Sequence, residues 1–407
     1  STSSAGFLSP AGDTFGMWCA FQIFGFRTQS KEGYLLRIIL SGGGTGGHIN
    51  PALAIAKKVR AEDPTAEILF CGGKGGLEEK LVPREGFELK TFAVHGLRRK
   101  LTPANIVYNV KVLAEAERSR KEAEQTVRTF RPDVVVGCGG YASFPVVRAA
   151  QKCGVPTLLL EVNAFPGVTT RQLARHADAV MICFEDSRAY FPGKNVILTG
   201  SPVRPEFLNA DRDRARREMK LDDRPLVVSV WGSLGAEHLN HCMPDFLRRV
   251  TEHDDWYVLH AIGSWGYTWV RDEIKAAGVD LAKHPNIDVR DYIYDMPTVM
   301  AAADLVLCRG GAATAAELAV MGKPAIIVPS PNVAENHQEK NARALEAKGG
   351  VEVILDRDVT GALLYERARA ILSDPVRLQK MSDAIRSVAQ PDALDRIYRC
   401  VRDAAGV

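Results

Sequence analysis

The chain has 407 residues, of which 46% are hydrophobic and 25% are charged, a composition typical of soluble globular proteins. This length exceeds one ordinary core, so two or more domains are expected. The formal net charge of +3 is too small to argue for binding of nucleic acid through bulk electrostatics. The eight cysteines form no C-x-x-C pair, which indicates reduced thiols in a cytoplasmic protein.

Residues 1–33 precede the first regular pattern and are interpreted as an N-terminal extension. Disorder, a cloning remnant and an added apolar contact are alternatives that the sequence leaves open. The most apolar part, Phe15–Phe26, is shorter than the roughly 18 apolar residues of a membrane-spanning helix. It also lacks a clear basic start or cleavage site, so no secretory signal is predicted.

A glycine-rich loop, Gly42–His48, follows an apolar run at Leu35–Leu40, and a helical pattern is predicted from Pro51 onwards. Glycines allow close approach of the backbone to a ligand, and the unpaired N–H groups at a helix start favour a negative group. The loop therefore predicts a site for a phosphate or a polar substrate, with an ordinary tight turn as the alternative. His48 titrates near neutral pH and could take a proton from a hydroxyl.

Apolar strands then alternate with helices along the whole chain, which predicts parallel sheets covered on both faces. The further strands expected in the first half are Ala66–Cys71, Phe87–Val94, Pro132–Gly137, Val155–Leu160, Asp178–Cys183 and Asn195–Leu198, with a long helix at Pro103–Phe130. In the second half they are Pro225–Trp231, Trp256–Ile262, Ile287–Val289, Asp304–Cys308 and Pro324–Pro329. The predicted fold class is α/β with two doubly wound domains joined at Gly200–Pro205.

Glycine loops recur at four predicted strand ends, namely Gly42–His48, Gly137–Tyr141, Gly232–Gly235 and Gly310–Thr314. Doubly wound sheets bind ligands at the carboxyl ends of their strands, so a cleft between the domains is the expected site. Four such loops around one cleft predict a large phosphorylated or sugar-bearing substrate.

Several polar side chains near these loops have two interpretations each. Thr314 and Glu317 have the spacing of a capping box, but Glu317 could instead accept from ribose hydroxyls. Ser233 is either a helix cap or a phosphate donor, and Arg204 either solvates the link or pairs with a phosphate. His337 and Gln338 are either solvent-exposed or bound to sugar hydroxyls.

The segment Leu97–Leu101 places three cations between leucines. A solvated loop is the common outcome for such a cluster, but leucines flanked by cations also suit an anionic lipid surface. The candidate membrane-contact residues are Leu97, Arg98, Arg99, Lys100 and Leu101.

From about Leu36 to its end, the chain resembles the MurG family of glycosyltransferases. The motifs that carry the resemblance are GGGTGGHINPALAIA, GLRRKLTPANI, GCGGYASFPV, EVNAFPGVT, GSPVRPEF, WGSLGAEHLN, YIYDM, CRGGAATAAELAVMGKPAIIVPSP and NHQEKNA, in the order of the family. The resemblance implies two facing Rossmann-like domains in the GT-B arrangement. It implies an inverting N-acetylglucosaminyltransferase that moves the sugar from UDP-N-acetylglucosamine to the 4-hydroxyl of the muramoyl sugar of lipid I, giving lipid II for peptidoglycan.

The resemblance also implies a domain plan and a location. Residues 34–200 would bind acceptor and membrane, residues 201–385 would bind UDP-N-acetylglucosamine, and a helix in 386–407 would pack back on the first domain. The implied location is peripheral, on the anionic cytoplasmic face of the bacterial membrane. Neither a nicotinamide or flavin cofactor nor a metal ligand set is implied, and no nucleic acid partner is expected.

Residue roles follow from the matching motif positions. On the acceptor side, Thr45, Gly46 and Gly47 match the loop near the transferred sugar and the acceptor diphosphate, and His48 matches the proposed general base. Asn163 matches a donor-sugar contact, Arg204 and Ser233 match diphosphate contacts, and Ile293 matches the position whose backbone reads uracil. The residues matched to phosphate, ribose and sugar hydroxyls are Ala312, Ala313, Thr314, Ala315, Ala316, Glu317, His337 and Gln338.

Leu160 and Val162 stand where the family usually has a histidine and a glutamine. This departure predicts weaker hydrogen bonding on the acceptor side and shifts weight onto His48, with Glu161 as its candidate catalytic partner. Four alternatives stay open: a GT-B enzyme with another lipid or aglycone acceptor, a UDP-N-acetylglucosamine 2-epimerase, a weakened family member and a non-catalytic sugar-nucleotide binder.

Overall fold

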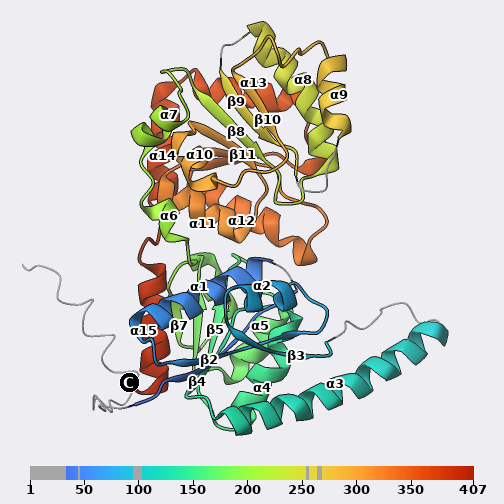
Figure 1. The fold of residues 1–407 in the computed structure, drawn as a ribbon, viewed down its shortest axis with the longest axis vertical. Helices are drawn as coiled ribbons and strands as arrows, with labels where there is room; N and C mark the ends of the chain where they lie inside the picture. The colour runs from blue at the N-terminus through green and yellow to red at the C-terminus, as the bar shows by residue number, and fades with distance from the viewer. Residues whose placement is uncertain (1–33, 45, 95–102, 254–255, 264–267) are drawn as a thin grey trace, which may run out of the picture.

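The computed structural model describes residues 34–44, 46–94, 103–253, 256–263 and 268–407. The chain forms two α/β domains stacked along the long axis of the molecule, the first below and the second above in Figure 1. Each domain is built on one parallel sheet with helices on both faces. This confirms the predicted fold class of two facing Rossmann-like domains.

The first sheet has seven parallel strands in the order β3-β2-β1-β4-β5-β6-β7. Their bounds are β1 Arg37–Ser41, β2 Glu67–Gly73, β3 Glu88–Phe92, β4 Val134–Gly137, β5 Thr157–Glu161, β6 Ala179–Ile182 and β7 Val196–Leu198. Successive side chains of a strand enter opposite cores: Ile38 and Leu40 pack in one cluster, and Ile39 packs in the other. Burial on both faces explains why these strands are continuous apolar runs in the sequence.

The helices of the first domain connect these strands. They are α1 Gly46–Glu62, α2 Glu78–Arg84, α3 Pro103–Phe130, α4 Phe144–Lys152 and α5 Val168–Leu173, with short 3₁₀ segments η2 Tyr141–Ser143, η3 Ala174–His176 and η4 Glu185–Tyr190. The prediction that the first helix begins at Pro51 was wrong, because α1 already begins at Gly46 and holds Pro51 inside it. A proline this close to a helix start removes few backbone hydrogen bonds. His48 consequently lies on a helix and not in the loop.

The second sheet has six parallel strands in the order β10-β9-β8-β11-β12-β13. The strands are β8 Leu226–Val230, β9 Tyr257–Ala261, β10 Ile287–Arg290, β11 Leu305–Cys308, β12 Ala325–Ile327 and β13 Val351–Val353. The helices are α6 Pro205–Leu208, α7 Arg212–Glu218, α8 Glu237–His253, α9 Trp269–Ala276, α10 Met296–Ala302, α11 Ala312–Met321, α12 His337–Glu346, α13 Gly361–Leu372 and α14 Pro375–Arg386, with η5 Ala334–Asn336 and η6 Asp356–Asp358.

The last helix, α15 Ala393–Ala405, returns to the first domain and lies beside α1 (Figure 1). Ile397 and Val401 are fully buried in the same apolar cluster as the β1 side chains. Asp395 pairs with Lys58 of α1 at 2.7 Å. The chain therefore crosses between the domains twice, and the first domain is made of two separate stretches of sequence.

The two crossing segments touch each other at Gly200. Its φ of +82° lies in the left-handed region, and a Cβ placed there would lie 2.3 Å from Cβ of Gln390 on the returning segment. A glycine is required at this position for both reasons. Among the described residues, no helix is both long and apolar enough to span a bilayer.

Candidate functional site

A pocket of about 950 Å³ opens between the two domains. Most of its lining comes from the second domain, Arg204 comes from the link, and Asn50 comes from α1 of the first domain. The second-domain residues follow the carboxyl ends of the strands, as expected for a doubly wound sheet. They include Gly232, Ser233, Gly235, Gly263, Asp291, Tyr292, Ile293, Arg309, Gly311, Thr314, Glu317, Ser330 and Gln338.

Helix α11 separates this pocket from a smaller one. Thr314 and Glu317 line the large pocket, whereas Ala312, Ala315 and Ala316 line the small one on the opposite side. Of the two interpretations of Thr314 and Glu317, the capping box was wrong: the N-cap residue is Gly311 and has no side-chain cap, so Thr314 lies inside the helix. Ala313 is exposed. The residues expected to bind phosphate and ribose together therefore lie on opposite sides of one helix.

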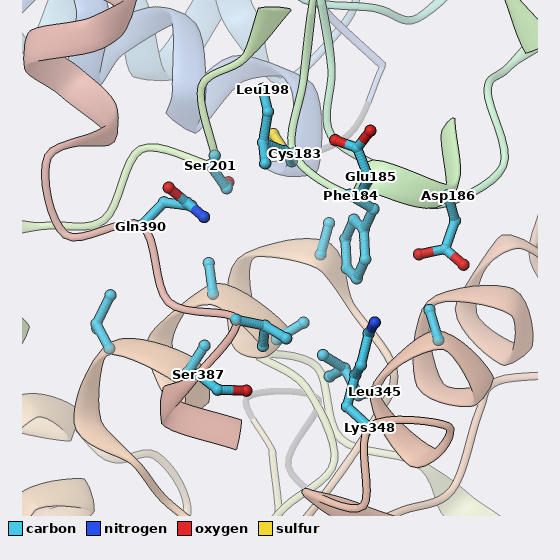
Figure 2. A pocket seen from close by; sticks show the side chains of 18 of the residues that line it. Cys183, Phe184, Glu185, Asp186, Leu198, Ser201, Leu345, Lys348, Ser387 and Gln390 are labelled. Carbon is cyan, nitrogen blue, oxygen red and sulfur yellow. The ribbon is translucent and has the colours of Figure 1, made fainter. Parts of the chain in front are cut away.

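The smaller cavity, of about 210 Å³, lies where the chain crosses between the domains (Figure 2). Phe184, Cys183 and Ser201 approach it from the first domain and the link. Lys348 of the segment after α12 points into it towards Phe184 (Figure 2). Helix α11 is thus packed against a cavity on its far side as well as against the large pocket.

Glu317 is one of the carboxylates that line the large pocket, and its side chain is 18% exposed. Burial raises its pKa to about 7, while the charge of Arg204 acts in the opposite direction. The Arg204 Nη2 atom lies 3.7 Å from Glu317 Oε1, and its guanidinium lies over the ring of Phe207 at 4.8 Å. An acceptor and a cation therefore stand together at the wall where α11 begins.

Three further predicted residues line the large pocket. Ser233 lies four residues before α8, too far from the helix start to be its cap. Gln338 accepts a hydrogen bond from the Ser330 backbone N–H at 2.9 Å through Oε1. Ile293 lines the pocket and is buried in an apolar cluster of the second domain.

His48 faces the cleft from the first domain without lining the large pocket. Its Nδ1 lies 3.1 Å from the carbonyl oxygen of Cys138. Because a carbonyl can only accept, Nδ1 carries the proton and Nε2 keeps its lone pair. Burial lowers the pKa of His48, the Cys138 carbonyl raises it, and the charge of His337 from the other domain lowers it. The imidazole is thereby kept neutral at neutral pH.

Glu161 lies below the same cleft but does not contact His48 in the described structure. Its Oε1 accepts from the Asn163 backbone N–H at 3.0 Å, and its Oε2 accepts from the Gly167 N–H at 3.1 Å. Burial raises the pKa of the Glu161 carboxyl, and these hydrogen bonds lower it. The geometry favours a role in holding the loop after β5, so a catalytic role for Glu161 stays a prediction.

Asn163 belongs to a hydrogen-bond network that joins the domains. Its Oδ1 accepts from Nδ2 of Asn341 at 3.1 Å, and Oδ1 of Asn341 accepts from the Ala164 N–H at 2.8 Å. Asn341, on α12, is fully buried and also donates to the Gly310 carbonyl at 3.3 Å. The loop after β5 is thus bonded directly to the elements that form the large pocket.

Leu160 and Val162 are core residues in this fold. Both are buried, and both pack in the cluster that holds Ile49 and Cys138. Neither side chain lines either cavity. Gly46 and Gly47 form the first turn of α1. Thr45 and the candidate membrane contacts Leu97, Arg98, Arg99, Lys100 and Leu101 lie outside the described residues.

Sequence reasoning missed several residues that line the pocket. Asp356 accepts from Arg309 at 2.5 Å and lies 3.0 Å from Nδ1 of His238. Arg309 directly follows β11 and could have been found from its position beside the glycine loop. Asp356 follows the short strand β13, which no sequence pattern predicted. Within the described ranges, no group of three His, Cys, Asp or Glu side chains is placed to hold a metal ion.

Two family models match the chain. The glycosyltransferase family 28 N-terminal domain matches residues 38–182, and the glycosyltransferase family 28 C-terminal domain matches residues 226–397. Together they cover the second sheet and the first sheet as far as β6.

Curated relatives are similar over nearly the whole chain. The UDP-N-acetylglucosamine--N-acetylmuramyl-(pentapeptide) pyrophosphoryl-undecaprenol N-acetylglucosamine transferase of Acetivibrio thermocellus is 42% identical, over 90% of this chain and 98% of that protein. The protein of the same name from Desulforamulus reducens is 43% identical, over 90% of this chain and 98% of its own length.

Solved structures agree with the fold. The crystal structure of Acinetobacter baumannii MurG matches with a TM-score of 0.74 and 26% identity, over 90% of this chain and 99% of that one. A putative UDP-N-acetylglucosamine 2-epimerase from Listeria monocytogenes matches with a TM-score of 0.62 and 16% identity, over 91% of this chain and 96% of that one, a likeness of fold alone.

Proposed function

We propose a function from one premise: this chain belongs to the MurG family of glycosyltransferases, as its identity to curated members over nearly its whole length requires. The chain is an inverting N-acetylglucosaminyltransferase. It moves N-acetylglucosamine from UDP-N-acetylglucosamine to the 4-hydroxyl of the muramoyl sugar of lipid I, and the product is lipid II for peptidoglycan synthesis. The observation that carries the proposal is this identity, joined to a large pocket between the two domains.

The donor nucleotide is assigned to the second domain, residues 201–385. A volume of about 950 Å³ suits a molecule as large as a sugar nucleotide. The start of α11 offers unpaired N–H groups to the diphosphate, and Arg204 adds a cation beside them. Glu317, on the same wall, is placed to accept from the ribose hydroxyls. Ser233, Ile293, His337, Gln338 and Asn163 complete the proposed donor contacts.

The acceptor is assigned to the first domain, residues 34–200, with His48 as the general base. The 4-hydroxyl attacks the anomeric carbon as the bond to UDP breaks, and Nε2 of His48 takes the hydroxyl proton directly or through water. The hydrogen bond of Nδ1 to the Cys138 carbonyl supports this role, because it fixes the tautomer with the free lone pair on Nε2. A lowered pKa supports it as well, since a base must be neutral before the reaction.

A peripheral position on the cytoplasmic face of the bacterial membrane follows from a lipid acceptor. The leucines and cations of Leu97–Leu101 are the proposed contact with anionic lipid. Binding to vesicles with and without anionic lipid, compared between the wild type and a variant with Arg98, Arg99 and Lys100 replaced by glutamine, tests this assignment. Equal binding by both proteins would exclude it.

One assay tests the transferase activity itself. Radiolabelled UDP-N-acetylglucosamine is incubated with a lipid I analogue, and label in the lipid product is measured beside UDP release without acceptor. Transfer that depends on acceptor and is lost in His48→Ala supports the proposal. Turnover of the donor alone would indicate an epimerase, and donor binding without any turnover would indicate a binding module.

A further inference from the structure

Glu78 of α2 is a buried carboxylate that the proposed mechanism does not use. It is 1% exposed and is the first residue of its helix. Its Oε1 accepts from the Gly73 N–H at 2.7 Å, and its Oε2 accepts from the Gly44 N–H at 3.3 Å. One side chain thus joins the loop after β1 to the last residue of β2.

The glycines around these two contacts make room for this carboxylate. A Cβ at Gly43 would lie 2.2 Å from Glu78 Oε1, and a Cβ at Gly76 would lie 2.3 Å from its Oε2. A Cβ at Gly72 would lie 2.6 Å from Glu78 Cγ. Glycine-rich loops are usually explained by close approach to a bound phosphate. Here the anion that the backbone surrounds belongs to the protein.

The same loop also touches the backbone that carries His48. A Cβ at Gly140 would lie 2.2 Å from the Gly43 carbonyl oxygen and 3.3 Å from Cδ2 of His48. A Cβ at Gly139 would lie 2.7 Å from Nδ1 of His48. Glu78, Gly43, Gly140 and the imidazole therefore lie next to one another in that order.

We propose that Glu78 is the positioning residue of the first-domain half of the site: its carboxylate acts as a resident anion that fixes the Gly42–Gly44 loop and so holds the His48 imidazole in place. The N–H groups of Gly44 and Gly73 already have an acceptor, so a substrate phosphate binds elsewhere while Glu78 is present. The expected loss of kcat on replacing Glu78 rests on the proposed transferase function. The expected displacement of the His48 ring does not.

The test compares Glu78→Gln with Glu79→Gln. Glu79 is the matched control because it is the next residue, is exposed, and also accepts from a glycine N–H, that of Gly75 at 3.0 Å. Glutamine keeps the shape of Glu78 but presents an N–H₂ group to one of the two backbone N–H donors. Since a displacement of about 1 Å can cost about 100-fold in rate, kcat of Glu78→Gln should fall by about 10- to 100-fold. Glu79→Gln should match the wild type.

Two measurements separate positioning from loss of fold. UDP affinity should stay within about twofold of the wild type in Glu78→Gln, because most of the donor pocket is built by the other domain. The imidazole NMR signals of His48, assigned by comparison with His48→Gln, should shift in Glu78→Gln and not in Glu79→Gln. This second measurement needs no substrate, so a wild type without transferase activity would refute the proposed function and still leave the role of Glu78 testable.

Glu78→Ala allows an independent test by chemical rescue, since formate can occupy the space left by the carboxylate. Formate is expected to restore part of the lost kcat in Glu78→Ala and to leave Glu79→Ala unchanged. The proposal is overturned if Glu78→Gln keeps the kcat of Glu79→Gln, if the His48 signals do not move, if UDP affinity is lost together with kcat, or if formate restores nothing.

Discussion

His48 combines a half-buried ring, a fixed tautomer and a position at the start of α1. Replacing it with glutamine should lower kcat by about 10²- to 10⁴-fold, the usual contribution of a general base, and should leave UDP affinity unchanged. Because burial holds its pKa below the usual 6.5, the base stays neutral until the pH falls below that value. The acidic limb of the kcat/KM profile should therefore lie below pH 6.5. An acidic limb that persists in His48→Gln would assign it to another group.

Glu317 should make stability depend on pH in the direction opposite to most carboxylates. Its pKa in the folded protein is about 7, raised from 4.5, so the folded state holds the proton more tightly than the unfolded state. This contribution to stability is complete below pH 4.5 and is lost as the pH rises through 7. Glu317→Gln should raise the Tm by a few degrees at pH 8 and leave it unchanged at pH 4.5, as measured by thermal unfolding. An exposed control, Glu206→Gln, should leave the Tm unchanged at both pH values.

At the residue scale, the sequence predicted which side chains face the cleft better than it predicted what they contact. Thr314 and Glu317 have the spacing of a capping box, yet the helix begins at Ala312, which places both side chains on the pocket wall. Glu161 was expected beside His48, but the backbone N–H groups of its own loop occupy its oxygens. Such contacts depend on loop conformations that no local pattern determines.

The loop after β5 and helix α12 are hydrogen-bonded to each other across the junction of the two domains. Asn341→Ala would leave the buried Ala164 N–H without its acceptor, which should cost about 1–3 kcal/mol in the free energy of unfolding. The matched control is Glu335→Gln, which removes the partly exposed pair with Arg171 at the same junction and should cost at most about 1 kcal/mol. Urea unfolding measures the free energy of unfolding of both variants. Equal losses in the two would contradict a structural role for the buried Asn341 hydrogen bond.

At the element scale, strands were predicted well because burial on both faces makes them apolar runs. The long helix expected at Pro103–Phe130 has those bounds in α3. The exceptions have physical causes: β13 carries Glu352 at its centre, and α1 begins before its proline. The charged residue means that β13 is not a continuous apolar run like the other three-residue strands β7 and β12, and a proline inside a helix resembles a proline at its start.

For the whole molecule, α15 is part of the first core although it follows the second domain in the chain. Ile397→Ala removes a fully buried side chain from the cluster that holds Ile38 and Leu40, and should cost about 2–5 kcal/mol. Arg399→Ala, on the exposed side of the same helix, should have little effect. Urea unfolding followed by circular dichroism measures the difference. Similar midpoints for both variants would show that α15 adds little to this core.

The return of α15 sets an order of events at the ribosome. The nascent chain releases the first sheet early, but Ile397 and Val401 leave the exit tunnel only after the entire second domain has been translated. Domains that are continuous in sequence can fold as they emerge, and here only the second one is continuous. Part of the apolar surface of the amino-terminal half of the newly made polypeptide therefore stays uncovered until the last helix has been synthesised and has packed against it.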